Sequence, residues 1–217
     1  MKITYTIQVC NESRELYSLL NFLLKVKDQE DNIVVVVDSL HTTEKVKLVT
    51  DKFSQDITLY ERPFDNFKDN SDFHREKATG DYIFGLDADE MPQEELFDYL
   101  KKIISESNAD VIYIPRINIH PGATKKFYKW INLPVNEFGW INWPDYQGRI
   151  YRNNGKVTWG GDSLHTTLIG SDKTIQLKPD PLIALWHIKA IEKQESRWDE
   201  SKSIASPTDK NLYDLLM

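Results

Sequence analysis

Two aspartates stand two positions apart in the segment Leu86-Asp87-Ala88-Asp89-Glu90, at the end of the apolar run 82–86. If that run is a strand, residues two apart project to the same side, so both carboxylates can face one ligand. Mg²⁺ and Mn²⁺ prefer oxygen ligands and are typically held by one or two carboxylates together with substrate phosphates. Ala88 leaves room for a substrate to approach. The alternative is an acidic loop with solvated carboxylates, so the position of the pair in the fold has to decide.

The first half of the chain alternates short apolar runs with amphipathic segments. The runs predict strands at 3–9, 33–37, 57–60, 82–86 and 111–114. Residues 33–37 are apolar throughout, which indicates a central strand covered on both faces in a parallel sheet. Leucines recur at helical spacing between the first two strands, at Leu16, Leu19, Leu20, Leu23 and Leu24. This order predicts an open, mostly parallel, Rossmann-like α/β sheet whose ligands lie beyond the carboxyl ends of its strands.

After about residue 115 the chain is richer in Pro, Asn, Gly and aromatic residues, and it contains all six tryptophans. Short strands are predicted at 148–151, 156–159, 174–177 and 182–186, followed by a helix from about residue 190. We expect one domain over 1–217, with a half at 1–115 that forms the parallel sheet and a smaller, mixed half at 116–217.

Composition limits the class of protein. The formal net charge of −7 disfavours non-specific binding to nucleic acid or to an anionic membrane. The longest aliphatic run, 33–37, is too short to span a bilayer, and the N-terminus lacks the pattern of a signal peptide. With the single cysteine Cys10, no internal disulfide is expected, which suits the cytoplasm, or the host cytoplasm if the source is viral.

Other classes of nucleotide-binding enzyme have sequence motifs that this chain lacks. No glycine-rich turn follows the first strand, and the sequence has no Gly-Lys-Ser or Gly-Lys-Thr phosphate loop. A dehydrogenase or phosphate-loop ATPase is therefore disfavoured. A sugar nucleotidyltransferase, which would also want a flexible glycine-rich loop at that place, becomes the second choice.

The segment 78–90, Ala-Thr-Gly-Asp-Tyr-Ile-Phe-Gly-Leu-Asp-Ala-Asp-Glu, resembles the central motif of the family 2 glycosyltransferases, which have the GT-A fold. The resemblance extends to Val-Cys-Asn-Glu at 9–12, Val-Asp-Ser at 37–39 and Gln-Gly-Arg-Ile-Tyr-Arg at 147–152. The overall style also resembles short glycosyltransferases encoded by bacteriophages. The resemblance implies transfer of a sugar, with inversion, from a nucleoside diphosphate sugar, a UDP-sugar being favoured, to an acceptor hydroxyl.

The same resemblance makes 1–115 the nucleotide-sugar-binding half and 116–217 the acceptor-binding half, in which Trp140, Trp143 or Trp159 could offer an apolar face to a sugar ring. It also assigns residues to the donor. The nucleotide side would be formed by Val9, Asn11, Glu12, Asp38, Asp72, Asp87 and Ala88. Mn²⁺ or Mg²⁺ would be held by Asp87, Asp89 and the late histidine His187. Each residue has a structural alternative: the polar groups at 11, 38 and 72 can cap helices or turns, and His187 can be a hydrogen-bonded core histidine.

The segment Gly160-Gly161-Asp162-Ser163-Leu164-His165-Thr166 resembles a family pattern in which the histidine is followed by a glutamate. Thr166 stands there in this chain. The base that takes the acceptor proton is then expected among Asp162, His165 and Asp145, although His165 can also be a hydrogen-bonding loop residue.

The acceptor stays open between glycan, lipid, protein and modified nucleic acid. Two other functions also stay open: the sugar nucleotidyltransferase, and a non-catalytic module that binds a nucleotide sugar or a glycan.

Overall fold

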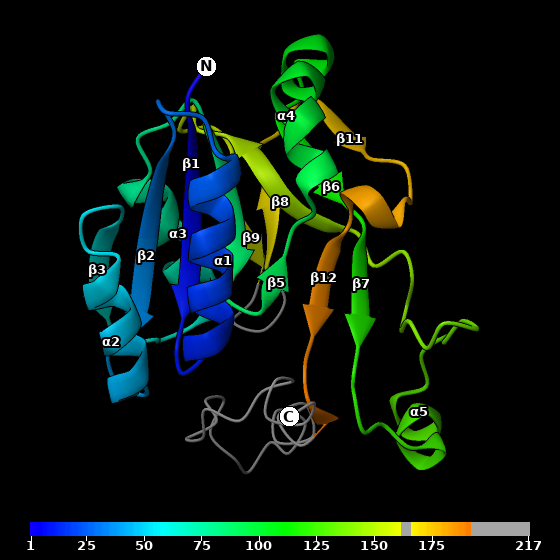
Figure 1. Ribbon diagram of the computed structural model, residues 1–217. Helices are drawn as coiled ribbons and strands as arrows, with labels where there is room; N and C mark the ends of the chain where they lie inside the picture. The colour runs from blue at the N-terminus through cyan, green and yellow to red at the C-terminus, as the bar shows by residue number, and fades with distance from the viewer. Residues whose placement is uncertain (162–165, 192–217) are drawn as a thin grey trace.

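A computed structural model describes residues 1–161 and 166–191. Its centre is a seven-stranded sheet in the order β11-β6-β8-β4-β1-β2-β3 (Figure 1). Only β8 among these strands runs antiparallel to its neighbours. The fold is therefore α/β with a mostly parallel sheet, as predicted. The strands are β1 (Ile3–Val9), β2 (Asn32–Asp38), β3 (Thr58–Arg62), β4 (Tyr82–Asp87), β6 (Val111–Ile114), β8 (Gln147–Arg152) and β11 (Thr174–Gln176).

Four helices connect the parallel strands and cover the sheet: α1 (Ser13–Val26), α2 (Glu44–Lys52), α3 (Phe67–Lys77) and α4 (Glu94–Ser107). In Figure 1, α1 lies in front of the sheet and α3 behind it. Four leucines of the predicted face of α1 are completely buried, and the fifth, Leu24, is partly buried. The side chains of Thr43 and Asn66 accept hydrogen bonds from the first turns of α2 and α3, which fixes where these helices begin.

Close packing of β4 against β1 explains the glycine that precedes β4. A Cβ atom added at Gly80 would lie 2.7 Å from the backbone nitrogen of Thr4 and 2.8 Å from the carbonyl oxygen of Lys2. The Gly80 nitrogen donates to the Thr4 hydroxyl. Only glycine fits this approach, and β4 then runs in register beside β1 to its carboxyl end.

The second half of the chain builds on the same sheet. Strand β8 lies between β4 and β6, so both halves contribute to one core. A three-stranded sheet in the order β5-β12-β7 adjoins it, and β9 pairs with β10 as a hairpin. The elements are β5 (Glu90–Met91), β7 (Arg116–Ile119), α5 (Lys125–Ile131), β9 (Thr158–Gly161), β10 (Thr166–Ile169), the 3-10 helix η1 (Pro181–Ile183) and β12 (Leu185–Ile188).

Local hydrogen bonds explain where the predicted elements shift. Strand β9 starts two residues later than predicted because the Asn154 side chain accepts from the nitrogens of Lys156 and Val157 and holds them in a turn. Strand β12 starts three residues later because Asp180 caps η1. Strands β5, β7 and β10 and helix α5 are too short to give a periodic signal and were not predicted. The helix expected from about residue 190 falls largely outside the described residues.

No helix within the described ranges is both long and apolar enough to cross a membrane.

Candidate active site

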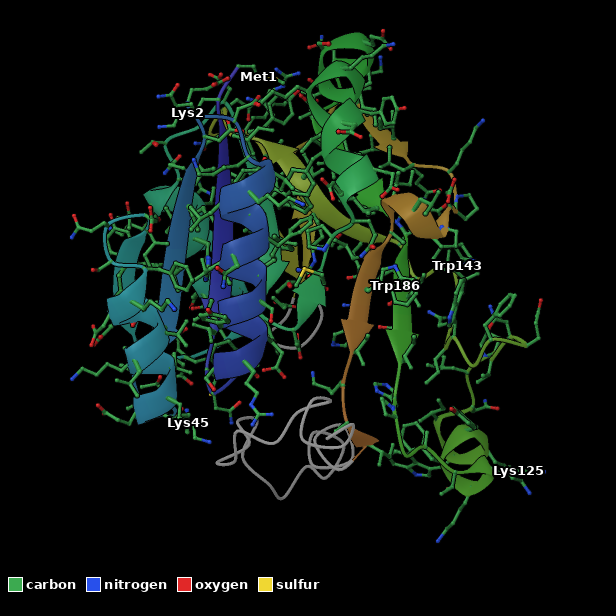
Figure 2. All side chains as sticks on the ribbon, viewed as in Figure 1. Met1, Lys2, Lys45, Lys125, Trp143 and Trp186 are labelled. Atoms are coloured by element: carbon green, nitrogen blue, oxygen red, sulfur yellow. The ribbon has the colours of Figure 1, made fainter. Side chains whose placement is uncertain are left out.

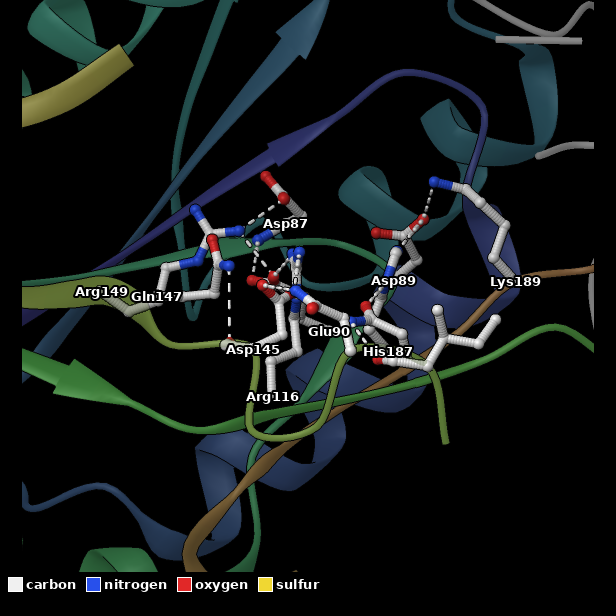
Figure 3. A network of polar contacts seen from close by, with 12 residues as sticks. Asp87, Asp89, Glu90, Arg116, Asp145, Gln147, Arg149, His187 and Lys189 are labelled. Carbon is white, nitrogen blue, oxygen red and sulfur yellow. Dashed lines mark hydrogen bonds and ion pairs between the residues drawn. The ribbon is translucent and has the colours of Figure 1, made fainter. Parts of the chain in front are cut away.

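Asp87 ends β4 at the carboxyl edge of the sheet, where it pairs with an arginine from the second half of the chain. Arg149 Nη2 donates to Asp87 Oδ2 at 2.6 Å and to Glu90 Oε1 at 2.6 Å. Arg116 Nη1 donates to the same Glu90 oxygen at 2.9 Å. Figure 3 shows these side chains converging on Glu90. Two guanidinium groups thus share the fully buried carboxylate of Glu90.

The charges in this cluster stabilise one another. Burial alone would raise the pKa of Asp87, but the Arg149 guanidinium outweighs it and holds that pKa below its usual value. Burial would lower the pKa of Arg149, yet Asp87 and Glu90 raise it. Asp87 is therefore ionised and already paired within the protein.

Asp89 faces away from this cluster toward β12 and the residues that follow it. Its Oδ2 lies 3.6 Å from His187 Nε2 and 3.0 Å from Lys189 Nζ. Strand β12 brings them there because His187 pairs in register with Glu90 of β5, the next residue after Asp89. Burial lowers the pKa of His187, so the ring is neutral in the fold. The prediction that His187 lies beside the aspartate pair is thus correct for Asp89.

The side chains at this edge can be compared with the ligands that the predicted divalent cation requires. In the described part of the chain, no three His, Cys, Asp or Glu side chains are gathered as a metal site, and Asp87 pairs with Arg149 instead. Asp89 and His187 remain as one oxygen and one nitrogen donor facing each other. Two protein donors suffice when diphosphate oxygens complete the shell, so this pair fits Mn²⁺ or Mg²⁺. The Lys189 ammonium competes for the same Asp89 oxygen.

Asp145, predicted as a candidate base, is tied into the wall of the site. Its Oδ2 accepts from Arg116 Nη2 at 2.6 Å and from Asn118 Nδ2 at 2.9 Å, and its Oδ1 accepts from Asn142 at 3.3 Å. Both oxygens therefore hold β7 and the loop before β8 in place. A function as base would require one of these partners to move. The other two candidates, Asp162 and His165, lie outside the described residues.

The loops after β1 and β2 meet at the edge where a nucleotide was predicted. Asp38 ends β2, and its Oδ1 accepts from the nitrogens of Leu40 and Phe64 while Oδ2 contacts His41 Nδ1 at 2.8 Å. The Cys10 thiol reaches the His41 carbonyl oxygen, which joins the two loops. Asp38 therefore organises this edge, whether or not it also contacts a nucleotide.

The residues after β1 differ in how their polar atoms are used. Glu12 Oε2 accepts from the nitrogens of Cys10 and Asn11 and shapes the loop. Asn11 is 1 % exposed, and neither its amide oxygen nor its amide nitrogen has a hydrogen-bond partner among the residues that the structure describes. A buried amide without partners is costly, which favours a ligand-facing function for Asn11. Val9 and Ala88 are buried at the ends of β1 and β4.

Asp72, also predicted on the nucleotide side, lies on α3. Its carboxylate pairs with Lys68 Nζ at 3.1 Å and with Arg75 Nε at 3.2 Å. The Trp159 nitrogen lies 3.5 Å from Asp72 Oδ1, so Asp72 links α3 to β9. These contacts give Asp72 a structural function, which is the alternative to contact with a nucleotide.

A cavity of about 440 Å³ opens beside Asp87, and we call it the Asp87 cavity. Among the described residues that line it, Asp87 is the only carboxylate. Thr166 also lines it, at the position where the family pattern has glutamate. Aromatic and polar side chains form other parts of the wall, among them Gln8, Ser71, Tyr113, Tyr146, Gln147 and Trp159.

The tryptophans divide between this cavity and a separate cluster. Trp159 lines the cavity and packs edge-on against Tyr151. Trp143 and Trp186, labelled in Figure 2, both contact the ring of Trp140. Of the three tryptophans predicted as sugar platforms, Trp159 is therefore the one at the cavity.

Several site residues were missed from the sequence. Lys189 carries a readable signal because it lies two positions after His187, which places both side chains on one face of an extended segment. Glu90 adjoins the aspartate pair, but its function as a shared partner of Arg116 and Arg149 has no local signature. Asn118 gives no signal at all, since only β7 and β12 pairing brings it to His187.

Comparisons with known proteins agree with this architecture. The crystal structure of S. aureus TarS 1-349 has a TM-score of 0.60 at 16 % identity, with 87 % of this chain and 60 % of that chain covered. The complex of TarS 1-349 with UDP-GlcNAc has a TM-score of 0.61 at 16 % identity and covers 87 % and 59 %. The chain thus spans less than two thirds of these structures, and the likeness shows the fold.

Comparison with curated protein sequences gives no match. The family model "Glycosyl transferase family 2" matches residues 6–167. This match runs from β1 to the β9–β10 hairpin and includes the Asp87–Asp89 segment, Arg149 and Thr166. The chain therefore belongs to glycosyl transferase family 2.

Proposed function

We propose that this protein transfers a sugar from a nucleoside diphosphate sugar to an acceptor hydroxyl, with a divalent cation and with inversion. The observation that carries the proposal is the position of Asp87 and Asp89 at the carboxyl end of a central parallel strand, with the Asp87 cavity beside them. Ligands of such sheets lie at this edge. Family membership supports the same reaction, and TarS 1-349 bound to UDP-GlcNAc has the same fold, which favours a UDP-sugar.

The nucleotide-sugar donor would contact two groups of residues, one at its nucleoside and one at its sugar. The loops after β1 and β2 would hold the nucleoside, with Asn11 offering its unpartnered amide and Asp38 shaping the edge. The transferred sugar would enter the Asp87 cavity, whose aromatic wall suits a sugar ring and whose polar groups suit its hydroxyls. Because Arg149 is neutralised by Asp87 and Glu90, the cavity suits an uncharged sugar.

Mn²⁺ or Mg²⁺ would be held by Asp89 and His187. Such a cation offsets the negative charge that develops on the departing diphosphate. Lys189, whose ammonium lies 3.0 Å from Asp89, would add a second positive charge on the same side. Asp162, His165 and Asp145 remain the proposed sources of the base for the acceptor hydroxyl. A base from 162–165 would follow β9 directly, next to the cavity residue Thr166.

Calorimetric titration with UDP and GDP, each with Mn²⁺ or with excess chelator, tests the donor site. We expect binding that requires the cation, because a cation held by Asp89 and His187 would bind the diphosphate oxygens directly. Equal affinity in chelator would contradict the metal-dependent proposal. Slow hydrolysis of UDP-GlcNAc with Mn²⁺, absent in the Asp89→Asn variant, would show transferase chemistry.

The same experiments separate the alternatives. A sugar nucleotidyltransferase would release pyrophosphate from a nucleoside triphosphate in the presence of a sugar phosphate. A non-catalytic module would bind the nucleotide sugar and leave it intact. The acceptor stays open between glycan, lipid, protein and modified nucleic acid. Cytoplasmic location and a relation to phage-encoded enzymes remain predictions from the sequence.

A further inference from the structure

Asn118 of β7 stands beside His187 of β12, in register across a parallel strand pair. Its amide nitrogen donates to the Ile141 carbonyl oxygen at 3.3 Å and to Asp145 Oδ2 at 2.9 Å. Both partners are acceptors only, because Asp145 also accepts from the Arg116 guanidinium. Rotating the amide by 180° would place its oxygen against these two oxygens. The orientation of the Asn118 amide is therefore fixed by its surroundings.

The fixed amide decides which nitrogen of His187 carries the proton. Asn118 Oδ1 lies 2.8 Å from His187 Nδ1, and an amide oxygen can only accept. Nδ1 must therefore carry a proton. Nε2 is then the ring nitrogen that can offer a lone pair, and this is the atom 3.6 Å from Asp89 Oδ2. A lone pair facing a carboxylate repels it unless a cation lies between them.

We propose that Asn118 is a positioning residue that holds His187 in the Nδ1-protonated form, so that Nε2 serves as the nitrogen ligand of a divalent cation shared with Asp89. The inference rests on the proposed function in its use of a cation. The hydrogen-bond chain behind it runs from Glu90 through Arg116, Asp145 and Asn118 to His187. Partners of this kind fix ring orientation and raise the basicity of a ligating histidine.

Nuclear magnetic resonance of ¹⁵N-histidine-labelled protein in excess chelator tests the tautomer directly, with His187→Ala to assign the signal. We expect a neutral ring with the proton on Nδ1. A neutral ring with the proton on Nε2 in the unmodified protein would overturn the proposal, and this outcome needs no variant to fold. Asn118→Ala should shift the ring toward the other tautomer. Asn142→Gly is the matched control because Asn142 contacts Asp145 but not His187, and glycine tolerates its φ of 57°.

Mn²⁺ affinity, measured by electron paramagnetic resonance with UDP present, supplies the second readout. Asn118→Ala should weaken Mn²⁺ by about 10–100-fold, and the loss should be smaller for Mg²⁺, which gains less from a nitrogen ligand. The loss should disappear when His187 is already Ala. An equal loss in that background would mean that Asn118 only supports the fold, which overturns the inference.

The experiments give a different result if the proposed cation site is wrong than if only the function of Asn118 is wrong. If Asp89→Asn and His187→Ala bind Mn²⁺ as tightly as the unmodified protein, the cation site is wrong whatever the tautomer. If those two variants lose Mn²⁺ while Asn118→Ala keeps both its tautomer and its affinity, the site stands and the positioning function of Asn118 is wrong.

Discussion

Replacing Lys189 by Met would expose the balance of charge around Asp89. The Lys189 residue is 2 % exposed, and its ammonium lies 3.0 Å from Asp89 Oδ2 in surroundings that water hardly reaches. Met keeps the length of the side chain and removes the charge. Breaking a buried ion pair from one side typically costs about 3–5 kcal/mol, because the remaining buried carboxylate loses a charged partner. For a domain of this size, that corresponds to a fall in melting temperature of about 6–20 °C.

The measurement is thermal unfolding in excess chelator and in saturating Mn²⁺. Lys189→Met should melt well below the unmodified protein in chelator and recover much of the difference in Mn²⁺, since the cation can replace the ammonium at Asp89. The unmodified protein should gain less from Mn²⁺ because Lys189 already occupies that oxygen.

The double variant Lys189→Met, Asp89→Asn is the control. It should melt above Lys189→Met in chelator, because the buried carboxylate that lost its ammonium partner is removed as well, and it should not respond to Mn²⁺. If the double variant is no more stable than Lys189→Met, the loss comes from packing and not from a buried carboxylate that lost a charged partner. If Lys189→Met does not respond to Mn²⁺, Asp89 is not a cation ligand.

Three further predictions concern other parts of the structure. Arg149→Met should lower the free energy of unfolding by about 3–5 kcal/mol, because Asp87 loses its guanidinium partner and Glu90 keeps only Arg116. Arg152→Met, at a more open ion pair with Asp110, should lower it by about 1 kcal/mol or less in chemical denaturation. Burial lowers the pKa of His74 from 6.5 to about 4, so the unfolded chain takes up the proton first and stability falls as pH drops through that interval. Between pH 7 and 4, the free energy of unfolding from chemical denaturation should fall by up to about 3 kcal/mol through this group, and His74→Gln should remove that part of the fall. If the pH dependence is the same in His74→Gln, other groups cause it. Gly80→Ala should lower the free energy of unfolding by roughly 1–3 kcal/mol, because its Cβ would clash with the β1 backbone. Gly85→Ala should be tolerated, because its Cβ would have only ordinary contacts. Equal melting temperatures of the two variants would contradict this packing.

Sequence patterns predicted the sheet of the first half well because each strand and helix there is long enough to show its period. Strands β1 and β6 have the predicted bounds, and the leucines of α1 form the buried face that their spacing required. The same logic placed Asp87 and Asp89 correctly at the carboxyl edge of the sheet.

Side-chain partners at the site were harder to predict. Residues two apart were expected to share one ligand, but Asp87 turns to Arg149 and Asp89 to Lys189, so the pair is split between two cations of the protein. Each partner lies 60 or more positions away in sequence and is brought there by β8 or by β12. Local spacing carries no information on such contacts, and the order of strands in the sheet supplies it only after folding.

The position of β8 affects how the chain folds during synthesis and where it can be truncated. Phe84 of β4 pairs with Ile150 of β8, and Ile150 in turn pairs with Ile112 of β6. During synthesis β4 and β6 therefore emerge long before the strand that joins them, and the sheet must wait with an open edge on β4. Long-range pairing of this kind slows folding and exposes strands that can aggregate. A fragment that ends at residue 115 would keep that edge, so the first half of the chain is not a unit that can be produced alone.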